Sequence, residues 1–399
     1  MRVAIFSETF LPKWDGVANT LCYLLDHLAD RGHSSLMFAP RGVIAHYAST
    51  PIVRLSGFDF PLYPGLRLVP PVFDVRRQLA DFRPDVVHLV NPVSLGLVGL
   101  RAARSLGLPV VMSYHTDLPG YTAHYGVGLL RDVAWAYFRW LHNQADLNLC
   151  PSHFTRRELE AQGFERIKVW THGVDTVRFH PRHRCAEWRN RLTDGHPEAL
   201  LLLYVGRLAV EKRVDWLGAV LEALPEARLA IVGNGPQRQA LERSFLDAPV
   251  VFTGYLRGDD LSRAYAAGDI FVFPSANETF GNVVLEAMAS GLAVVAPRSG
   301  GPVDLVRDGE TGYLFESDDQ GDMVKRVLEC VQDTERMRWM GRMARAFAET
   351  QRWDVILDGV IEEYSSLVAR HRMVQRGPWS FAPPPVGLGP RQRSFDRPG

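Results

Sequence analysis

The chain has few cysteines and no long apolar segment. No apolar run in its 399 residues reaches the roughly 18 residues that a membrane-spanning helix requires. The opening residues 1–10 carry Glu8 beside a short apolar stretch, which indicates a buried strand and not a secretory signal. The 4 cysteines lack the CxxC spacing of zinc and redox sites. They predict a reduced, cytoplasmic protein without disulfides or a structural metal.

The chain also lacks an excess of charge of either sign. Its 45 basic and 45 acidic residues balance, so the composition does not favour nucleic acid as a partner. The pattern G-x-G-x-x-G does not follow the first apolar run. This absence argues against a dinucleotide-dependent oxidoreductase.

Short apolar runs alternate with helical patterns along most of the chain. This alternation predicts α/β architecture with parallel sheets. We expect four parts: a Rossmann-like domain over residues 1–173, a second over 174–350, a helix crossing back within 351–376, and a disordered tail over 377–399.

Three finer expectations concern element boundaries. The Pro- and Gly-containing residues 8–18 predict a loop, with a helix beginning at Asn19. The run at 146–151 is expected to be the last strand of the first domain. The polar stretch at 179–196 is expected to be irregular.

The chain is organised around residues 277–301, NETFGNVVLEAMASGLAVVAPRSGG. Glu278 is expected in a loop and Glu286 inside the helix that follows. A helix N-terminus offers free backbone N–H groups to an anion, whereas carboxylates accept hydrogen bonds from sugar hydroxyls. The pattern therefore predicts a ligand with a phosphate and hydroxyl-rich ends. At the helix entry it is expected to meet Phe280, Gly281, Asn282 and Val283.

A second candidate site element follows the apolar run at 200–205. Gly206 and Arg207 come directly after this run, and Lys212 follows one loop later. Arginine can bind two phosphate oxygens at once and lysine adds a point charge, so we expect a diphosphate site. No Asp-x-Asp metal motif occurs in the chain. We therefore expect fixed cations to neutralise the diphosphate, with no metal or other cofactor.

The first domain supplies three further candidates. Gly16 follows the first strand, where a parallel sheet binds ligands and a glycine permits close backbone approach. His115 and Asp117 follow the apolar run at 110–114. We expect His115 to bind a sugar hydroxyl or the leaving phosphate.

These motifs together resemble the retaining nucleotide-sugar glycosyltransferases of family 4, which have the two-domain GT-B fold. The resemblance rests on E-x7-E, on G-R-L followed by E-K, and on SGGPVDLV, and it covers nearly the whole chain. It implies that Glu278 contacts the sugar, Glu286 the ribose, and the backbone at Tyr255 and Leu256 the nucleobase. It also implies same-face attack without a protein nucleophile.

The resemblance is greatest to the branch that makes glycolipids, including sulfoquinovosyl-diacylglycerol synthases and lipid mannosyltransferases. It implies a GDP-mannose or UDP-hexose donor and a lipid or glycolipid acceptor at the inner membrane face. The aromatic helix expected at 132–144, with Arg131 and Arg139, either packs on the sheet or also meets the bilayer surface.

Several alternatives stay open at this point. The acceptor could be a soluble glycan or a small molecule. The chain could instead be a nucleotide-sugar epimerase, a glucan synthase, or a non-catalytic protein that binds nucleotide sugars or lipids. The intact set of Arg207, Lys212, Glu278 and Glu286 argues against the non-catalytic reading.

Overall fold

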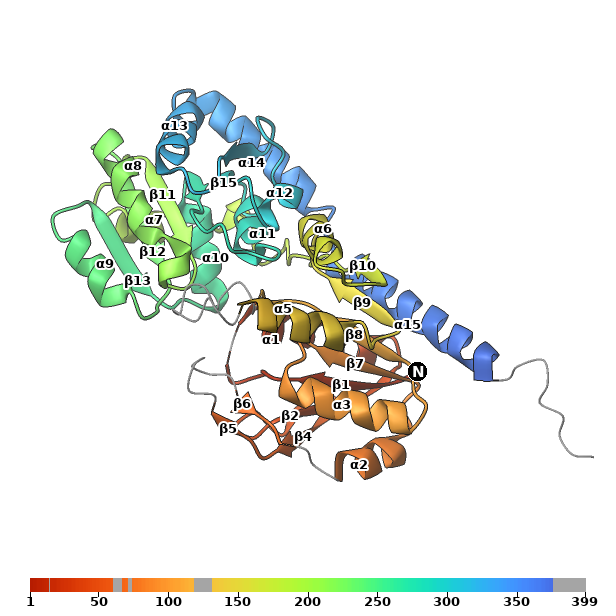
Figure 1. Ribbon diagram of the computed structural model, residues 1–399. Coiled ribbons are helices and arrows are strands. Elements are labelled where there is room, and N and C mark those ends of the chain that lie inside the picture. The colour runs from red at the N-terminus through yellow and green to blue at the C-terminus, as the bar shows by residue number, and fades with distance from the viewer. Residues whose placement is uncertain (14, 60–66, 71–73, 118–130, 376–399) are drawn as a thin grey trace, which may run out of the picture.

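The computed structural model describes residues 1–13, 15–59, 67–70, 74–117 and 131–375. Two domains, each a parallel β-sheet flanked by helices, face one another in Figure 1. The long helix α15 (Trp353–Gln375) leaves the second domain and runs back along the first. The predicted α/β class with two Rossmann-like domains is confirmed. No described helix is long and apolar enough to cross a membrane.

The first sheet has the strand order β10-β9-β8-β7-β1-β2-β4-β3 and is parallel except for its last pair. Its central strands are fully buried because their residues are almost all apolar. The sheet strands are β1 (Arg2–Ser7), β2 (Ser34–Pro40), β3 (His46–Tyr47), β4 (Thr50–Leu55), β7 (Val86–Val90), β8 (Val110–Ser113), β9 (Leu147–Cys150) and β10 (Ile167–Val169). A separate hairpin pairs β5 (Phe58–Asp59) with β6 (Arg67–Leu68).

Helices cover both faces of this sheet and enclose one apolar core on each side. One core joins the sheet to α1 and α15, and the other joins it to α2 and α3. The helices of the domain are α1 (Gly16–Asp30), α2 (Asp74–Phe82), α3 (Ser94–Ser105), α5 (Arg131–His142) and α6 (His153–Ala161).

The second sheet is parallel throughout, with the order β13-β12-β11-β14-β15-β16. Its strands are β11 (Leu201–Val205), β12 (Arg228–Val232), β13 (Val250–Gly254), β14 (Ile270–Val272), β15 (Ala293–Pro297) and β16 (Gly312–Phe315). The surrounding helices are α7 (Ala186–Leu192), α8 (Leu217–Ala223), α9 (Arg238–Ser244), α10 (Gly258–Ala267), α11 (Asn282–Ala289), α12 (Pro302–Leu305), α13 (Gln320–Val331) and α14 (Thr334–Ala348), with short 3-10 turns at Pro181–His183, Val210–Lys212 and Val214–Trp216.

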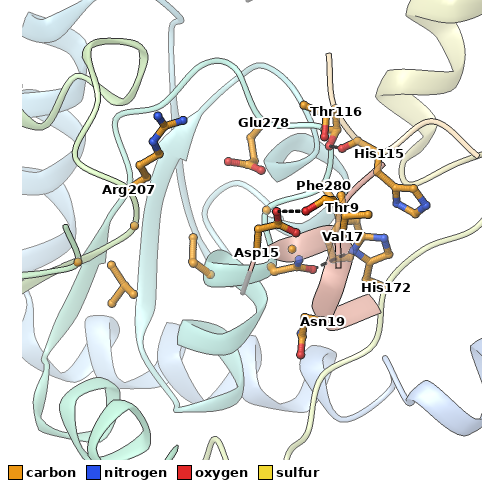
Figure 2. A pocket seen from close by; sticks show the side chains of 18 of the residues that line it. Thr9, Asp15, Val17, Asn19, His115, Thr116, His172, Arg207, Glu278 and Phe280 are labelled. Atoms are coloured by element: carbon orange, nitrogen blue, oxygen red, sulfur yellow. Dashed lines mark hydrogen bonds between the residues drawn. The ribbon is translucent and has the colours of Figure 1, made fainter. Parts of the chain in front are cut away.

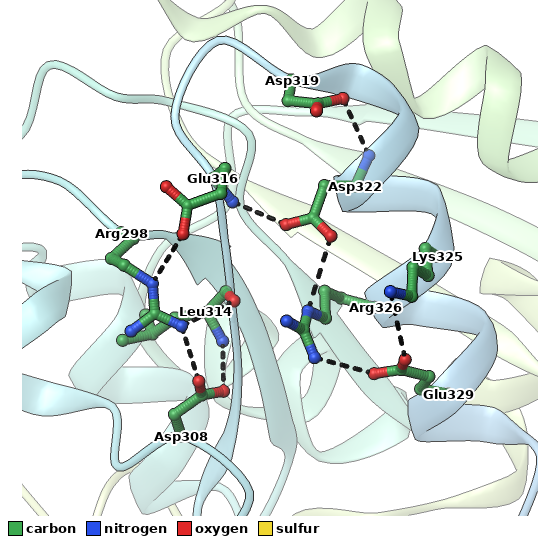
Figure 3. Close-up of polar contacts among 9 residues, drawn as sticks. All are labelled: Arg298, Asp308, Leu314, Glu316, Asp319, Asp322, Lys325, Arg326 and Glu329. Carbon is green, nitrogen blue, oxygen red and sulfur yellow. Dashed lines mark hydrogen bonds and ion pairs between the residues drawn. The ribbon is translucent and has the colours of Figure 1, made fainter.

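The outer edge of the second sheet carries a network of ion pairs (Figure 3). Arg298 bridges Asp308 and Glu316, at 2.6 and 3.1 Å. On α13, Arg326 bridges Asp322 and Glu329. The Asp322 carboxylate also accepts the backbone N–H of Glu316 at 2.7 Å, which joins the two halves. Because these groups are partly exposed, we expect each pair to add little stability and the network mainly to align α13 with β16.

Three boundary expectations are wrong. Helix α1 begins at Gly16 because the Asp15 carboxylate caps it by accepting the N–H of Ala18 at 2.9 Å. Strand β10 follows β9, and its short edge position and exposed Lys168 hide it from an apolar pattern. The stretch at 179–196 contains α7, which buries Trp188 and Leu192.

The expected domain boundary at residue 173 lies in the extended segment between β10 and the 3-10 turn Pro181–His183. Helix α15 lies within the expected crossing segment 351–376. The expected disordered tail, 377–399, lies outside the described residues.

Each sheet changes its winding direction at one place. Strand β1 lies between β7 and β2 in the first sheet, and β11 lies between β12 and β14 in the second. In open parallel sheets, ligands bind beyond the carboxyl ends of the strands at such a point. The residues that follow β1 and β7 should therefore face those that follow β11 and β14.

Candidate active site

A cleft of about 690 Å³ lies at these strand ends, with lining residues from both domains. Every predicted site residue except Lys212 lines it: Gly16, His115, Asp117, Gly206, Arg207, Tyr255, Leu256, Glu278, Phe280, Gly281, Asn282, Val283 and Glu286. In Figure 2, Arg207 reaches in from one side, and His115 and His172 lie together on the other. The tertiary structure therefore brings together segments from both ends of the chain.

The anion site combines Arg207 with the N-terminus of α11. Arg207 is exposed, and no described residue forms an ion pair or hydrogen bond with its guanidinium. Gly281 precedes the helix with φ of 97°, and none of the described side chains caps the helix there. A glycine tolerates this left-handed conformation. The first backbone N–H groups of α11 can therefore bind an anion beside a fixed cation.

The two glycines of the SGG segment shape this loop from behind. A Cβ atom on Gly301 would lie 2.2 Å from the Phe280 backbone, and one on Gly300 would lie 2.3 Å from the Glu278 carbonyl oxygen. The N–H of Gly301 donates to that carbonyl oxygen at 2.7 Å. The close backbone approach explains why the motif needs glycine, and it fixes the loop that carries Glu278.

Lys212 was predicted to lie at the diphosphate site, but it does not line the cleft. Its Nζ forms an ion pair with Glu278 at 2.8 Å, and only 12% of its side chain is exposed. Burial favours the neutral amine, but the charge of Glu278 outweighs it with other neighbours, so the pKa of Lys212 is raised. Lys212 therefore holds the Glu278 carboxylate in place, while Arg207 faces the cleft.

Glu286 has a buried partner that sequence reasoning missed. The Tyr265 hydroxyl donates to its Oε2 atom at 2.9 Å, and Tyr265 is fully buried. Burial raises the pKa of Glu286 to about 7, although the bond from Tyr265 and the charge of Arg178 oppose this shift. A carboxylate held in this way can accept hydrogen bonds from a pair of sugar hydroxyls.

Glu8, at the end of β1, is a second residue that was missed as a site component. It lines the cleft, and its Oε1 atom accepts the N–H groups of Val93, Leu95 and Gly96 at 2.8, 2.8 and 3.2 Å. Burial raises the pKa of Glu8 to about 7 despite these bonds. Its position directly after the first strand was the signal that could have identified it.

The loop after β8 is held from two sides. The Asn91 side-chain oxygen accepts the N–H groups of His115 and Thr116 at 3.3 and 3.2 Å. Across the cleft, the Thr279 hydroxyl donates to the His115 carbonyl oxygen at 2.6 Å. Asp117, also in this loop, accepts a hydrogen bond from the Tyr114 hydroxyl at 2.9 Å. Residues 114–117 of this loop are therefore held by hydrogen bonds from both domains.

His172 lies where the chain passes between the domains. Its ring stacks on His115 with 5.6 Å between centroids, and its Nδ1 atom contacts Asn282 Oδ1 at 2.9 Å. Burial lowers the pKa of His172 to about 4, although the bond with Asn282 opposes this shift. Both neutral imidazoles line the cleft beside the N-terminus of α11.

The described residues contain no cluster of His, Cys, Asp or Glu side chains that could hold a metal ion. Arg207 and the carboxylates of Glu278 and Glu286 are among the charged groups that line the cleft. This donor set suits an anion with attached hydroxyl groups.

Comparison with protein families gives two matches. Residues 199–333 match the model described as "Glycosyl transferases group 1", and residues 14–178 match "Glycosyltransferase Family 4". The chain is 41% identical over 380 residues to a GDP-mannose-dependent alpha-mannosyltransferase of Mycobacterium tuberculosis, covering 93% of this chain and 98% of that one. It is 37% identical to sulfoquinovosyl transferase SQD2 of Arabidopsis thaliana, covering 92% and 74%.

Two more distant likenesses extend this result. The chain is 27% identical to alpha-monoglucosyldiacylglycerol synthase of Streptococcus pneumoniae, covering 83% of this chain and 78% of that one. Sucrose-phosphate synthase of Thermosynechococcus elongatus has the same fold, with a TM-score of 0.78 at 21% identity, covering 92% and 99%. The sequence similarity, the two facing Rossmann-like domains and the anion site lead to one conclusion. The chain belongs to glycosyltransferase family 4 and is a retaining hexosyltransferase of the GT-B fold.

Proposed function

We propose that this enzyme transfers a hexosyl group from a nucleotide diphosphate sugar to a lipid or glycolipid acceptor, without a metal ion. The preferred hexosyl group is mannosyl. The observation that carries the proposal is the Arg207 guanidinium, which pairs with no described residue, beside the N-terminus of α11, which no described side chain caps, with Glu278 and Glu286 in the same cleft. These groups match a diphosphate with a sugar at one end and a ribose at the other.

The mechanism follows from where charge develops. As the sugar departs, negative charge grows on the leaving diphosphate, and Arg207 with the α11 N–H groups stabilises it. The departing phosphate oxygen then accepts the proton of the attacking hydroxyl on the same face of the sugar. Glu278, held by Lys212, orients the sugar. Because the hydroxyl attacks the same face that the diphosphate leaves, the configuration is retained. No carboxylate needs to act as a nucleophile.

For the donor we propose GDP-mannose, with a UDP-hexose as the alternative. The support is the mannosyltransferase with 41% identity over nearly its whole length. The base would lie near Tyr255, whose ring is half exposed at the cleft and is covered by the Arg257 guanidinium at 4.8 Å. An aromatic ring paired with a guanidinium offers a flat stacking surface for a base.

For the acceptor we propose a lipid reached from a membrane surface through α5. Val133 and Trp140 are 64% and 49% exposed and lie seven residues apart, on one helix face. Arg131 and Arg139 on the same helix are exposed and can meet anionic headgroups. A relative is named for its diacylglycerol product, which supports a lipid acceptor. We propose a peripheral location on the cytoplasmic membrane face, because a lipid acceptor lies in a membrane.

A donor screen tests the proposal. GDP- and UDP-sugars are offered in EDTA, and nucleoside diphosphate release is followed with and without diacylglycerol or glycolipid vesicles. We expect release from one donor, raised by lipid and unchanged by EDTA. Loss of release in EDTA with recovery on Mg²⁺ would overturn metal independence. Release raised only by soluble glycans would overturn the lipid acceptor.

The membrane contact has its own test. We expect Val133→Asp with Trp140→Ala to reduce flotation with anionic vesicles, while the activity on a detergent-dispersed acceptor stays close to wild type. The matched control is Leu246→Asp, a residue 79% exposed in the second domain after α9. Equal flotation of wild type and the α5 variant would contradict the role of α5.

A further inference from the structure

A chain of buried hydrogen bonds leads from α15 to the cleft. The Tyr364 hydroxyl lies 2.7 Å from His88 Nδ1, and His88 Nε2 lies 2.8 Å from Ser113 Oγ. Ser113 Oγ in turn lies 2.9 Å from His115 Nε2. The members come from α15, β7, β8 and the loop after β8. We call this set the Tyr364 chain.

The two histidines of the Tyr364 chain, His88 and His115, are neutral. Burial lowers the pKa of His88 to about 3. Burial, with smaller contributions from the His172 and His88 charges, also lowers the pKa of His115 well below its ordinary value. A neutral imidazole has one protonated and one bare nitrogen. Each ring can therefore donate from one nitrogen only. The hydrogen bonds of the Tyr364 chain must then all be donated in the same direction along it.

The direction follows from the Tyr364 hydroxyl. Tyr364 is 0% exposed, and among the described residues its hydroxyl bonds only to His88 Nδ1. If the hydroxyl accepted that bond, its own proton would be buried without a partner away from the cleft lining, where a ligand does not reach it. The opposite direction places the one unpaired proton on His115, which lines the cleft. Tyr364 therefore donates to His88 Nδ1, His88 donates from Nε2 to Ser113, and Ser113 donates to His115 Nε2.

This direction leaves the proton of His115 on Nδ1. That atom has no hydrogen-bond partner among the described residues, although it is buried, and His115 lines the cleft. An unpaired buried donor gains a bond when a ligand oxygen reaches it. If the proton of His115 were on Nε2, its Nδ1 atom could not donate a hydrogen bond.

We propose that Tyr364 is a positioning residue for the transfer reaction: through His88 and Ser113 it holds His115 in the Nδ1-protonated tautomer, which donates a hydrogen bond to an oxygen of the sugar or the leaving phosphate. The inference rests on the proposed function only for the identity of that oxygen. It also gives a function to helix α15. This helix crosses back to the first domain and so brings Tyr364, from the C-terminal part of the sequence, to the first sheet.

The test reads the tautomer directly. The His115 nitrogens are observed by ¹⁵N NMR in histidine-labelled protein and assigned with His115→Gln. We expect wild type to be protonated on Nδ1. In Tyr364→Phe the donor is lost, so both tautomers of His115 should appear, and kcat/KM should fall roughly 3- to 10-fold.

Tyr47→Phe is the matched control. It removes one hydroxyl from the same domain, where Tyr47 donates to Asp26 at 2.9 Å away from the cleft lining. Its His115 tautomer and its kcat/KM should equal those of wild type. If Tyr364→Phe does not fold, Ser113→Ala interrupts the same chain without altering α15, and it should give the same mixture of tautomers.

Two outcomes would overturn the inference. One is Nε2 protonation of His115 in wild type. The other is an unchanged His115 tautomer, or an unchanged kcat/KM, in the variant that interrupts the chain. Because the tautomer is measured without substrate, a wild-type enzyme that transfers no sugar would contradict the proposed function and leave this measurement intact.

Discussion

The Thr279 hydroxyl donates to the carbonyl oxygen of His115 at 2.6 Å, and so connects the segments that carry Glu278 and His115 across the domain boundary. Thr279 follows Glu278 directly, and its own carbonyl accepts the Thr155 hydroxyl at 3.1 Å. One residue of the second domain is thus bonded to two segments of the first. The position of Glu278 in the cleft therefore depends on the packing of the two domains against each other.

We expect Thr279→Val to lower kcat/KM by roughly 5- to 20-fold, because it removes a cross-domain hydrogen bond and leaves the His115 carbonyl unpaired. Thr279→Ser, which keeps the hydroxyl, should stay near wild type. Steady-state kinetics on the donor would measure both. Equal rates for the valine variant and wild type would show that the reaction does not need this hydrogen bond.

Arg207→Ala should lower kcat by about 10²- to 10³-fold, the scale of losing one preorganised charge at the leaving group. The folded protein should keep its stability within about 0.5 kcal/mol, because the side chain is exposed. Arg307→Ala, which removes an exposed arginine paired with Glu310, is the control. Full activity of Arg207→Ala would exclude the arginine from the diphosphate site.

Lys212→Met should lower both stability and activity, because it leaves the Glu278 carboxylate without its cation. We expect a loss of about 1–3 kcal/mol in the free energy of unfolding, below the range for fully buried pairs because 27% of the Glu278 side chain is exposed. Urea unfolding of Lys212→Met, Glu278→Gln and the double variant measures the coupling. Strictly additive losses would contradict a direct interaction.

Glu286 makes stability depend on pH. Burial raises its folded pKa to about 7 from an ordinary value of 4.5, so the folded state binds the proton more tightly than the unfolded state does. The contribution of Glu286 to stability is therefore full below about pH 4.5 and decreases as pH rises towards 7. Glu286→Gln, which still accepts the Tyr265 hydroxyl, should remove this decrease.

The pH prediction is checked by thermal unfolding of wild type and Glu286→Gln across this window. The variant should gain relative to wild type as pH rises. Nucleotide affinity should show the opposite sign, because the ionised carboxylate is the better acceptor for ribose hydroxyls, so wild type should bind more tightly above pH 7 than below. A constant stability difference between the two proteins would mean that Glu286 is ionised throughout.

The local pattern was sufficient for the two α/β domains, and every predicted site residue except Lys212 lines the cleft. Parallel sheets bury both faces, so their strands read as continuous apolar runs, and site residues follow these runs directly, as Arg207 does after β11. Gly281 at the start of α11 was also predicted, and its left-handed backbone favours glycine. The close backbone approach at Gly300 and Gly301 became visible only in the structure.

The partners of the site residues required the tertiary structure. Glu8 bonds to Val93 across 85 positions, and Tyr364 bonds to His88 across 276. Spacing along a strand or helix carries no information about such pairs, because they depend on which elements pack together. For the same reason, motif residues alone could not show that Lys212 would bond to Glu278 and leave Arg207 to face the cleft.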